Sequence, residues 1–257
     1  MLTLLFTGLP EALTSLTPIT WAFLVVAAVA IGISKTALPG AATLAVALFA
    51  SVLPAKESTG TMLVLLLVGD VLAITMYRRE ADWPTLKRLV PGVLAGVVLG
   101  AIFLRFASDQ FTKQFIGALL LVLIAATMTL MRLPKPPEIQ GRLGRITYGT
   151  LAGFTTMAAN AGGPVTTMYF LASKFSVMSF LGTTAWFFGI VNVLKLPFSV
   201  GLGIIKPSTL WIDAALAPIV VVAGFAGRWL AKRMHKQLFD AVVTILTVGS
   251  AVYLLVG

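Results

Sequence analysis

The stretch GISKTALPGA, residues 32–41, interrupts an apolar segment that runs from about residue 20 to residue 53. It holds a lysine, two hydroxyl side chains, a proline and two glycines where a membrane-spanning helix would carry apolar side chains. The whole segment is too long for one span, so the interruption predicts a broken helix whose two short arms form a pair. Such a pair is typical of a re-entrant segment, which enters the membrane and returns to the same side.

A second interruption of the same kind lies later in the chain. The stretch NAGGP, residues 160–164, breaks the apolar segment 146–172 and again combines glycine with proline. Both residues disfavour the interior of a helix, because proline lacks an N–H group and glycine loses the most conformational freedom. We therefore expect a second broken helix pair here.

The composition places these breaks in a membrane protein. Hydrophobic residues make up 58% of the 257 residues, charged residues make up only 11%, and the mean hydropathy is +0.99. A soluble domain is about half apolar and about a quarter charged. Further apolar segments are about long enough to cross the ~30 Å hydrocarbon layer as helices, namely residues 59–77, 86–104, 112–131, 178–199, 208–230 and 237–256.

The chain divides into two halves whose apolar segments follow the same order. Pro39 matches Pro164 and Asp70 matches Asn192, at offsets of 125 and 122 residues, which places the length changes in loops. The division lies in the longest polar stretch, MRLPKPPEIQGRLGR. We predict a first repeat over residues 1–131 with an N-terminal arm over 1–18, a cytoplasmic linker over 132–145 and a second repeat over 146–257.

The number of spans in each half predicts the fold class. Each half contains one broken, re-entrant helix pair and three further spans, which is an odd number because the pair returns to its starting side. The second half is then inverted relative to the first. The prediction is an all-α polytopic membrane protein built from two inverted structural repeats.

The formal net charge of +10 indicates topology rather than a nucleic-acid partner, because the basic residues gather in short loops between apolar segments. These loops fall on one side of the predicted fold, which the positive-inside rule makes the cytoplasmic side. Both termini then lie on the other side, and the expected location is the plasma (inner) membrane. The basic residues of these loops are Arg78, Arg79, Lys87, Arg88, Arg132, Lys135, Arg142, Arg145, Lys232, Arg233 and Lys236.

Several motifs resemble the TauE/SafE family of sulfite and organosulfonate exporters. They are GISKTALPGAATLAVALFA and LVPGVLAGVVLG in the first half, and NAGGPVTTMYFL followed by FLGTTAWFFGIVNVLKLP in the second. The resemblance implies a transporter with two related halves that moves small sulfur-containing anions outward across the inner membrane. The chain differs from the family pattern in TALPGA after the Ser-Lys pair and in Asn160, where family members often carry histidine.

The two breaks predict an anion site. Proline is favoured at the first position of a helix, so Pro39 and Pro164 predict the starts of the return arms. The next backbone N–H groups would lack helical partners and carry the positive end of the helix dipole, and the two inverted starts would face each other near the midplane. The alternative is that both breaks are only tight turns. The expected substrate-binding residues are Ser34, Lys35, Thr36, Pro39, Gly40, Ala41, Asn160, Ala161, Gly162, Gly163, Pro164, Val165, Thr166 and Thr167.

Three charged side chains inside apolar segments have two interpretations each. Lys35 is either a charge partner of the anion or a lysine at the cytoplasmic interface. Asp70 either carries a coupling ion or proton, together with the matching Asn192, or is paired with Lys35 or Asn192 and serves packing only. Lys195 either attracts the substrate or extends along its helix to the membrane surface, and its place near the outer end of its segment favours the surface.

No catalytic group or metal site accompanies these residues. The chain has no cysteine, its one histidine, His235, lies in a loop, and the adjacent Ser34 and Lys35 do not face each other on a helix. We therefore expect no enzyme activity, no cofactor and no metal, and as partners a small anionic substrate and the lipid bilayer, without nucleic acid.

The predicted function is that of a secondary transporter which exports sulfite or an organosulfonate with ion or proton coupling. The alternative is a permease or channel for another small anion, such as a carboxylate, because the same site would serve it.

Overall fold

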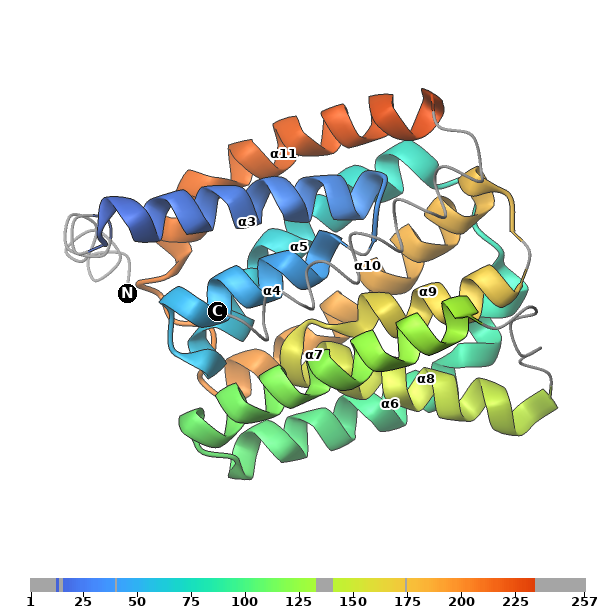
Figure 1. The fold of residues 1–257 in the computed structure, drawn as a ribbon, viewed down its shortest axis with the longest axis horizontal. Coiled ribbons are helices and arrows are strands. Elements are labelled where there is room, and N and C mark those ends of the chain that lie inside the picture. The colour runs from blue at the N-terminus through green and yellow to red at the C-terminus, as the bar shows by residue number, and fades with distance from the viewer. Residues whose placement is uncertain (1–12, 14–15, 40, 133–140, 174, 234–257) are drawn as a thin grey trace.

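The computed structural model describes residues 13, 16–39, 41–132, 141–173 and 175–233. Within these residues the regular structure is entirely helical, as Figure 1 shows. The helices of the first half are α3 (Pro18–Thr36), α4 (Ala41–Val52), α5 (Ala55–Tyr77), α6 (Trp83–Phe106) and α7 (Asp109–Arg132). Those of the second half are α8 (Gly141–Ala159), α9 (Gly162–Ala172), α10 (Val177–Gly201) and α11 (Leu210–Arg233).

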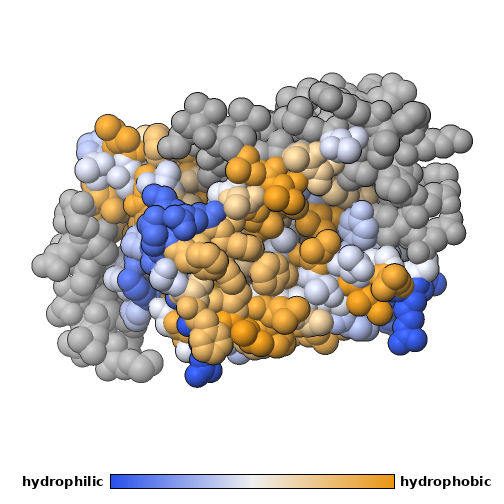
Figure 2. Space-filling view, turned by 60° about the horizontal axis from the view of Figure 1, so that its bottom comes forward, coloured by the Kyte–Doolittle hydropathy of each residue, from blue (hydrophilic) through white to orange (hydrophobic). Residues whose placement is uncertain are grey.

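The predicted all-α membrane fold is confirmed. Among the described residues, five helices are long and apolar enough to cross a membrane, namely α3, α5, α6, α10 and α11. Their outward faces carry exposed apolar side chains such as Leu99, Ile102 and Phe225. Figure 2 shows apolar residues across the middle of one face and hydrophilic residues gathered toward its two ends, as expected for a protein that spans a bilayer. The expected span over residues 237–256 lies outside the described residues.

Both predicted breaks are present. Thr36 ends α3 and Ala41 begins α4, while Ala159 ends α8 and Gly162 begins α9. With 12 and 11 residues, α4 and α9 are about 16–18 Å long, too short to cross the ~30 Å hydrocarbon layer. Each pair starts and finishes at the same end of the bundle, α3 and α4 at one end and α8 and α9 at the other (Figure 1).

Two parallel helix pairs connect the halves through glycines. A Cβ atom on Gly96 of α6 would lie 2.1 Å from the Thr150 carbonyl oxygen of α8, and one on Gly32 of α3 would lie 2.4 Å from the Val220 carbonyl oxygen of α11. Only glycine permits such close backbone approach. Helix α3, the first of the first half, thus packs against α11 of the second half. Helix α8, the first of the second half, packs against α6 of the first half. Figure 1 shows that α3 and α11 run opposite to α6 and α8, an arrangement compatible with two inverted repeats.

The structure corrects two expected boundaries. Helix α7 ends at Arg132 and helix α8 begins at Gly141, so six described residues of the expected linker 132–145 are helical. Helix α9 begins at Gly162 rather than at Pro164, which is its third residue. Proline is tolerated there because the first turn of a helix has no intrahelical partner for its N–H groups. A proline therefore marks a helix start only to within one turn.

Candidate functional site

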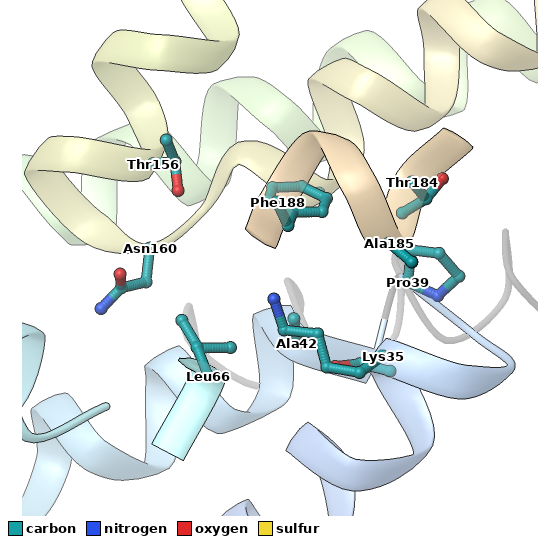
Figure 3. Close-up of a pocket in the computed structure, with 11 residues that line it drawn as sticks. Lys35, Pro39, Ala42, Leu66, Thr156, Asn160, Thr184, Ala185 and Phe188 are labelled. Atoms are coloured by element: carbon teal, nitrogen blue, oxygen red, sulfur yellow. The ribbon is translucent and has the colours of Figure 1, made fainter. Parts of the chain in front are cut away.

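The two breaks meet in the middle of the bundle. A Cβ atom on Gly163 would lie 3.1 Å from the carbonyl oxygen of Pro39, so α9 starts against the turn that precedes α4. Beside this contact lies a cavity of about 20 Å³, which is room for one water molecule. Figure 3 shows its walls, which come from both halves, with the Lys35 amino group reaching into the space between Leu66, Asn160 and Phe188.

Lys35 forms a buried ion pair on the wall of this cavity. Its Nζ atom lies 2.6 Å from Oδ1 of Asp70 on α5, and the two side chains are 7% and 2% exposed. The same Nζ atom lies 4.8 Å from the ring centroid of Phe188, a cation–π contact. The interpretation of Lys35 as an interface lysine is therefore wrong, because the side chain turns inward from the end of α3 toward α5.

Asn192 extends the ion pair into the second half. Its Nδ2 atom donates a hydrogen bond of 2.6 Å to Oδ2 of Asp70. Asp70 thus has Lys35 on one oxygen and Asn192 on the other, so both of the partners that the sequence offered as alternatives are present. The roles of Asp70 and Asn192 in ion or proton coupling stay a prediction.

Lys195 is completely buried, at 0% exposure. Its ammonium group donates to Oδ1 of Asn160 at 2.5 Å, to Oδ1 of Asn192 at 3.3 Å and to Oγ1 of Thr156 at 3.4 Å. The expected extension to the membrane surface is therefore wrong. Helix α10 continues six residues beyond Lys195 to Gly201, and these acceptors draw the side chain inward.

Asn160 lies at the break between α8 and α9, and its side chain forms hydrogen bonds with α5 and α10. It follows the last residue of α8 and has a φ of 54°, the left-handed conformation that often ends helices. Its Nδ2 atom donates to the Thr59 carbonyl oxygen at 2.9 Å while its Oδ1 atom accepts from Lys195. Asparagine adopts this conformation more readily than most residues, so backbone and side chain both favour it here.

The free backbone N–H groups that we expected after Pro39 and Pro164 are only partly present. The N–H of Ala41 donates to the Leu38 carbonyl oxygen at 2.8 Å, and that of Ala42 donates to the Pro39 carbonyl oxygen at 3.3 Å. Gly40 lies outside the described residues. Because α9 begins at Gly162, the unpaired N–H groups of its first turn come earlier than the expected Val165–Thr167.

Several expected hydroxyl donors bond to their own helices instead. Ser34 donates to the Ile31 carbonyl oxygen at 2.8 Å, and Thr36 donates to that of Gly32 at 3.1 Å. Thr166 donates to the carbonyl oxygens of Gly162 and Gly163, both at 2.9 Å. These hydroxyl protons are therefore used within their own helices and are not directed at a ligand.

The predicted binding residues divide into two sets. The cavity is lined by Ser34, Lys35, Pro39, Asn160 and Gly163. The remaining described residues of the prediction lie near the breaks without lining it: Thr36, Ala41, Ala161, Gly162, Pro164, Val165, Thr166 and Thr167.

The predicted set omits six lining residues, namely Ala42, Leu66, Thr156, Thr184, Ala185 and Phe188. Alanine, leucine, threonine and phenylalanine are ordinary residues in apolar helices, so no local signal distinguishes them. The one available clue was that Thr156 lies four residues before Asn160, about one helical turn away. Residues four apart lie on the same face of a helix.

The arrangement suits a small anion. It combines two ammonium groups, one carboxylate and neutral hydroxyl and amide groups in a water-poor interior, where each charge acts more strongly than in water. Among the described residues, no three His, Asp or Glu side chains lie close enough together to hold a metal ion.

A family model described as Sulfite exporter TauE/SafE matches residues 24–254, nearly the whole chain. The chain belongs to the TauE/SafE family. No curated protein and no solved structure matches it. The predicted family is thus confirmed, and this TauE/SafE protein is a multi-pass membrane protein of an exporter family.

Asn160 offers a test of this geometry. We expect Asn160→Ala to lower the free energy of unfolding by about 2–4 kcal/mol, because it removes a buried hydrogen bond to a charged group and places alanine in a left-handed conformation. Asn160→Gly keeps the backbone freedom and loses only the side chain, so it should be about 1 kcal/mol less damaging. Thermal unfolding of the purified variants in detergent measures both, and equal losses would show that the backbone conformation is no constraint.

Proposed function

We propose that this TauE/SafE protein is a secondary transporter that exports a small sulfur-containing anion, such as sulfite or an organosulfonate. The observation that carries the proposal is the cavity at the meeting point of the two broken helix pairs, with the Lys35 ammonium group on its wall. The family description, sulfite exporter, supports the substrate class.

Lys35 and Thr156 supply the groups that contact the anion. An ammonium group has three protons, and Asp70 takes one of those of Lys35, which leaves donors for sulfite or sulfonate oxygens. The Thr156 hydroxyl accepts from Lys195, so its own proton can be donated to the anion. Phe188 and Leu66 form the apolar part of the wall and exclude water.

Transport requires the cavity to open to each side in turn. Its present volume of about 20 Å³ is too small for a sulfonate, so binding would require the site to widen. The walls belong to both halves, and a rocking movement of one half against the other would open the cavity alternately. The contact between Pro39 and Gly163 would separate in that movement.

The membrane orientation forms part of the proposal. The helices α5 and α11 end, and α6 and α8 begin, at the same end of the bundle (Figure 1), and basic residues gather there. By the positive-inside rule this end faces the cytoplasm, with the protein in the plasma (inner) membrane.

Single cysteines test this orientation, because the natural chain has none. Glu80 and Ser208 are both exposed, Glu80 between the end of α5 and the start of α6 and Ser208 just before the start of α11. The end of α5 and the start of α11 lie at opposite ends of the bundle (Figure 1). In intact cells, a thiol reagent that does not cross the membrane should label Ser208→Cys and leave Glu80→Cys unlabelled until the cells are opened. The reverse pattern would invert the proposed topology.

Reconstitution in liposomes tests the substrate class. We expect labelled sulfite and ethanesulfonate to cross the membrane well above the rate of empty vesicles, and a small carboxylate such as acetate to cross much more slowly. Lys35→Met should reduce transport at least about ten-fold, since it removes a buried charge partner of the anion. Lys206→Met is the matched control, because Lys206 is 52% exposed and pairs with Glu57 away from the cavity. Faster movement of acetate would favour the carboxylate permease or channel instead.

Coupling to protons forms part of the proposal and is assigned to Asp70. The groups that face it are Lys35 and Asn192, with Lys195 behind Asn192. A proton on Asp70 would break its ion pair with Lys35 and change the net charge that the anion meets. We expect ethanesulfonate transport by the natural protein to respond to an imposed pH gradient and that of Asp70→Asn to be insensitive to it. An equal response in both proteins would remove Asp70 from coupling.

A further inference from the structure

We propose that the site selects monovalent anions, and that the buried charges of Lys35, Asp70 and Lys195 set this selectivity. The inference rests on the proposed function, since it specifies which members of the sulfur-anion class the same cavity takes. With Asp70 ionised, the carboxylate cancels Lys35, and Lys195 supplies one positive charge in excess.

Lys195 has no carboxylate partner among the described residues. Among the described residues, ion pairs within 4.0 Å join Lys35 to Asp70 and Lys206 to Glu57, and Lys195 takes part in neither. Its three hydrogen bonds go to a hydroxyl and to two amide oxygens, which are neutral acceptors. An ammonium group carries three protons, so this set of acceptors fits the charged form.

The Lys195 ammonium group lies beside the cavity. Thr156 and Asn160 both line the cavity, and both accept hydrogen bonds from Lys195. Lys195 therefore lies directly behind Thr156 and Asn160, which separate it from the cavity. Figure 3 shows Thr156 and Asn160 on the same side of the cavity, opposite Lys35. An anion in the cavity would lie between the two ammonium groups.

Asp213 is a buried acidic residue outside this network. Its exposure is 3%, and neither carboxylate oxygen has a hydrogen-bond partner among the described residues. The ion pairs within 4.0 Å among these residues do not include Asp213. It therefore does not neutralise Lys195 by contact.

Charge balance then separates mono- from dianions. One bound monoanion brings the net charge of the network and ligand to zero. A dianion would leave one negative charge uncompensated in a closed interior, where burying an unpaired charge is costly. The site should therefore bind a sulfonate with one charge more tightly than a molecule of similar size with two.

Two ligands of fixed charge test the inference. Ethanesulfonate carries one charge and 1,2-ethanedisulfonate carries two. Calorimetric titration of the detergent-purified full-length protein should show tighter binding of ethanesulfonate by roughly ten-fold or more. If the liposome assay shows sulfonate transport while both ligands bind equally, the charge selectivity is wrong and the proposed function stands. If no sulfur anion is transported, the proposed function itself fails.

Three variants connect the selectivity to the charge count. Asp70→Asn raises the net charge to two and should move the preference to the disulfonate, whereas Lys195→Met lowers it to zero and should weaken ethanesulfonate binding about ten-fold. The double variant Asp70→Asn/Lys195→Met restores one positive charge and should restore the preference for ethanesulfonate. A preference that does not return in a folded double variant would overturn the charge count as its cause. Size-exclusion profiles check folding, and Lys195→Gln replaces Lys195→Met where the latter does not fold.

Discussion

The burial of two ammonium groups and one carboxylate constrains the packing of the helices around them. Ionised groups in a water-poor interior are tolerated only when they are paired or fully hydrogen-bonded. Lys35 forms an ion pair with Asp70 and a cation–π contact with the ring of Phe188. Lys195 donates hydrogen bonds to three neutral oxygens. These contacts join α3, α5, α8 and α10, so the charges fix how the two halves meet.

The network also indicates how the two halves differ in chemistry. The offset of 125 residues that matches Pro39 with Pro164 also matches Lys35 with Asn160, and Asp70 matches Asn192. In the first half the two positions form an ion pair, whereas in the second both are amides bridged by the ammonium group of Lys195. The matching residues Asp70 and Asn192 contact each other at 2.6 Å, as residues near a two-fold axis would. Two aspartates there would repel each other, and the asparagine avoids this.

The sequence predicted the helical membrane fold and both breaks because hydropathy and proline or glycine content are local signals. It also predicted that Lys35, Asn160 and Gly163 would come together, since the matching of the halves placed them at equivalent breaks. It failed for Lys195, because no local pattern tells whether a lysine near a helix end turns toward lipid headgroups or inward. It missed Thr156 and Phe188 for a related reason: membership of a cavity wall depends on neighbours that are distant in sequence.

The breaks contribute to the proposed anion site in a different way from the one their prolines indicated. A helix terminus carries only about half a charge, and the first N–H groups of α4 are already engaged by Leu38 and Pro39. What the breaks provide is a pair of helix C-termini in the middle of the bundle, those of α3 and α8. The negative ends of these helices favour cations. Lys35 lies in the last turn of α3, and the Lys195 ammonium group contacts Thr156 and Asn160 at the end of α8. The dipoles therefore stabilise the ammonium groups, which in turn would stabilise the proposed anion.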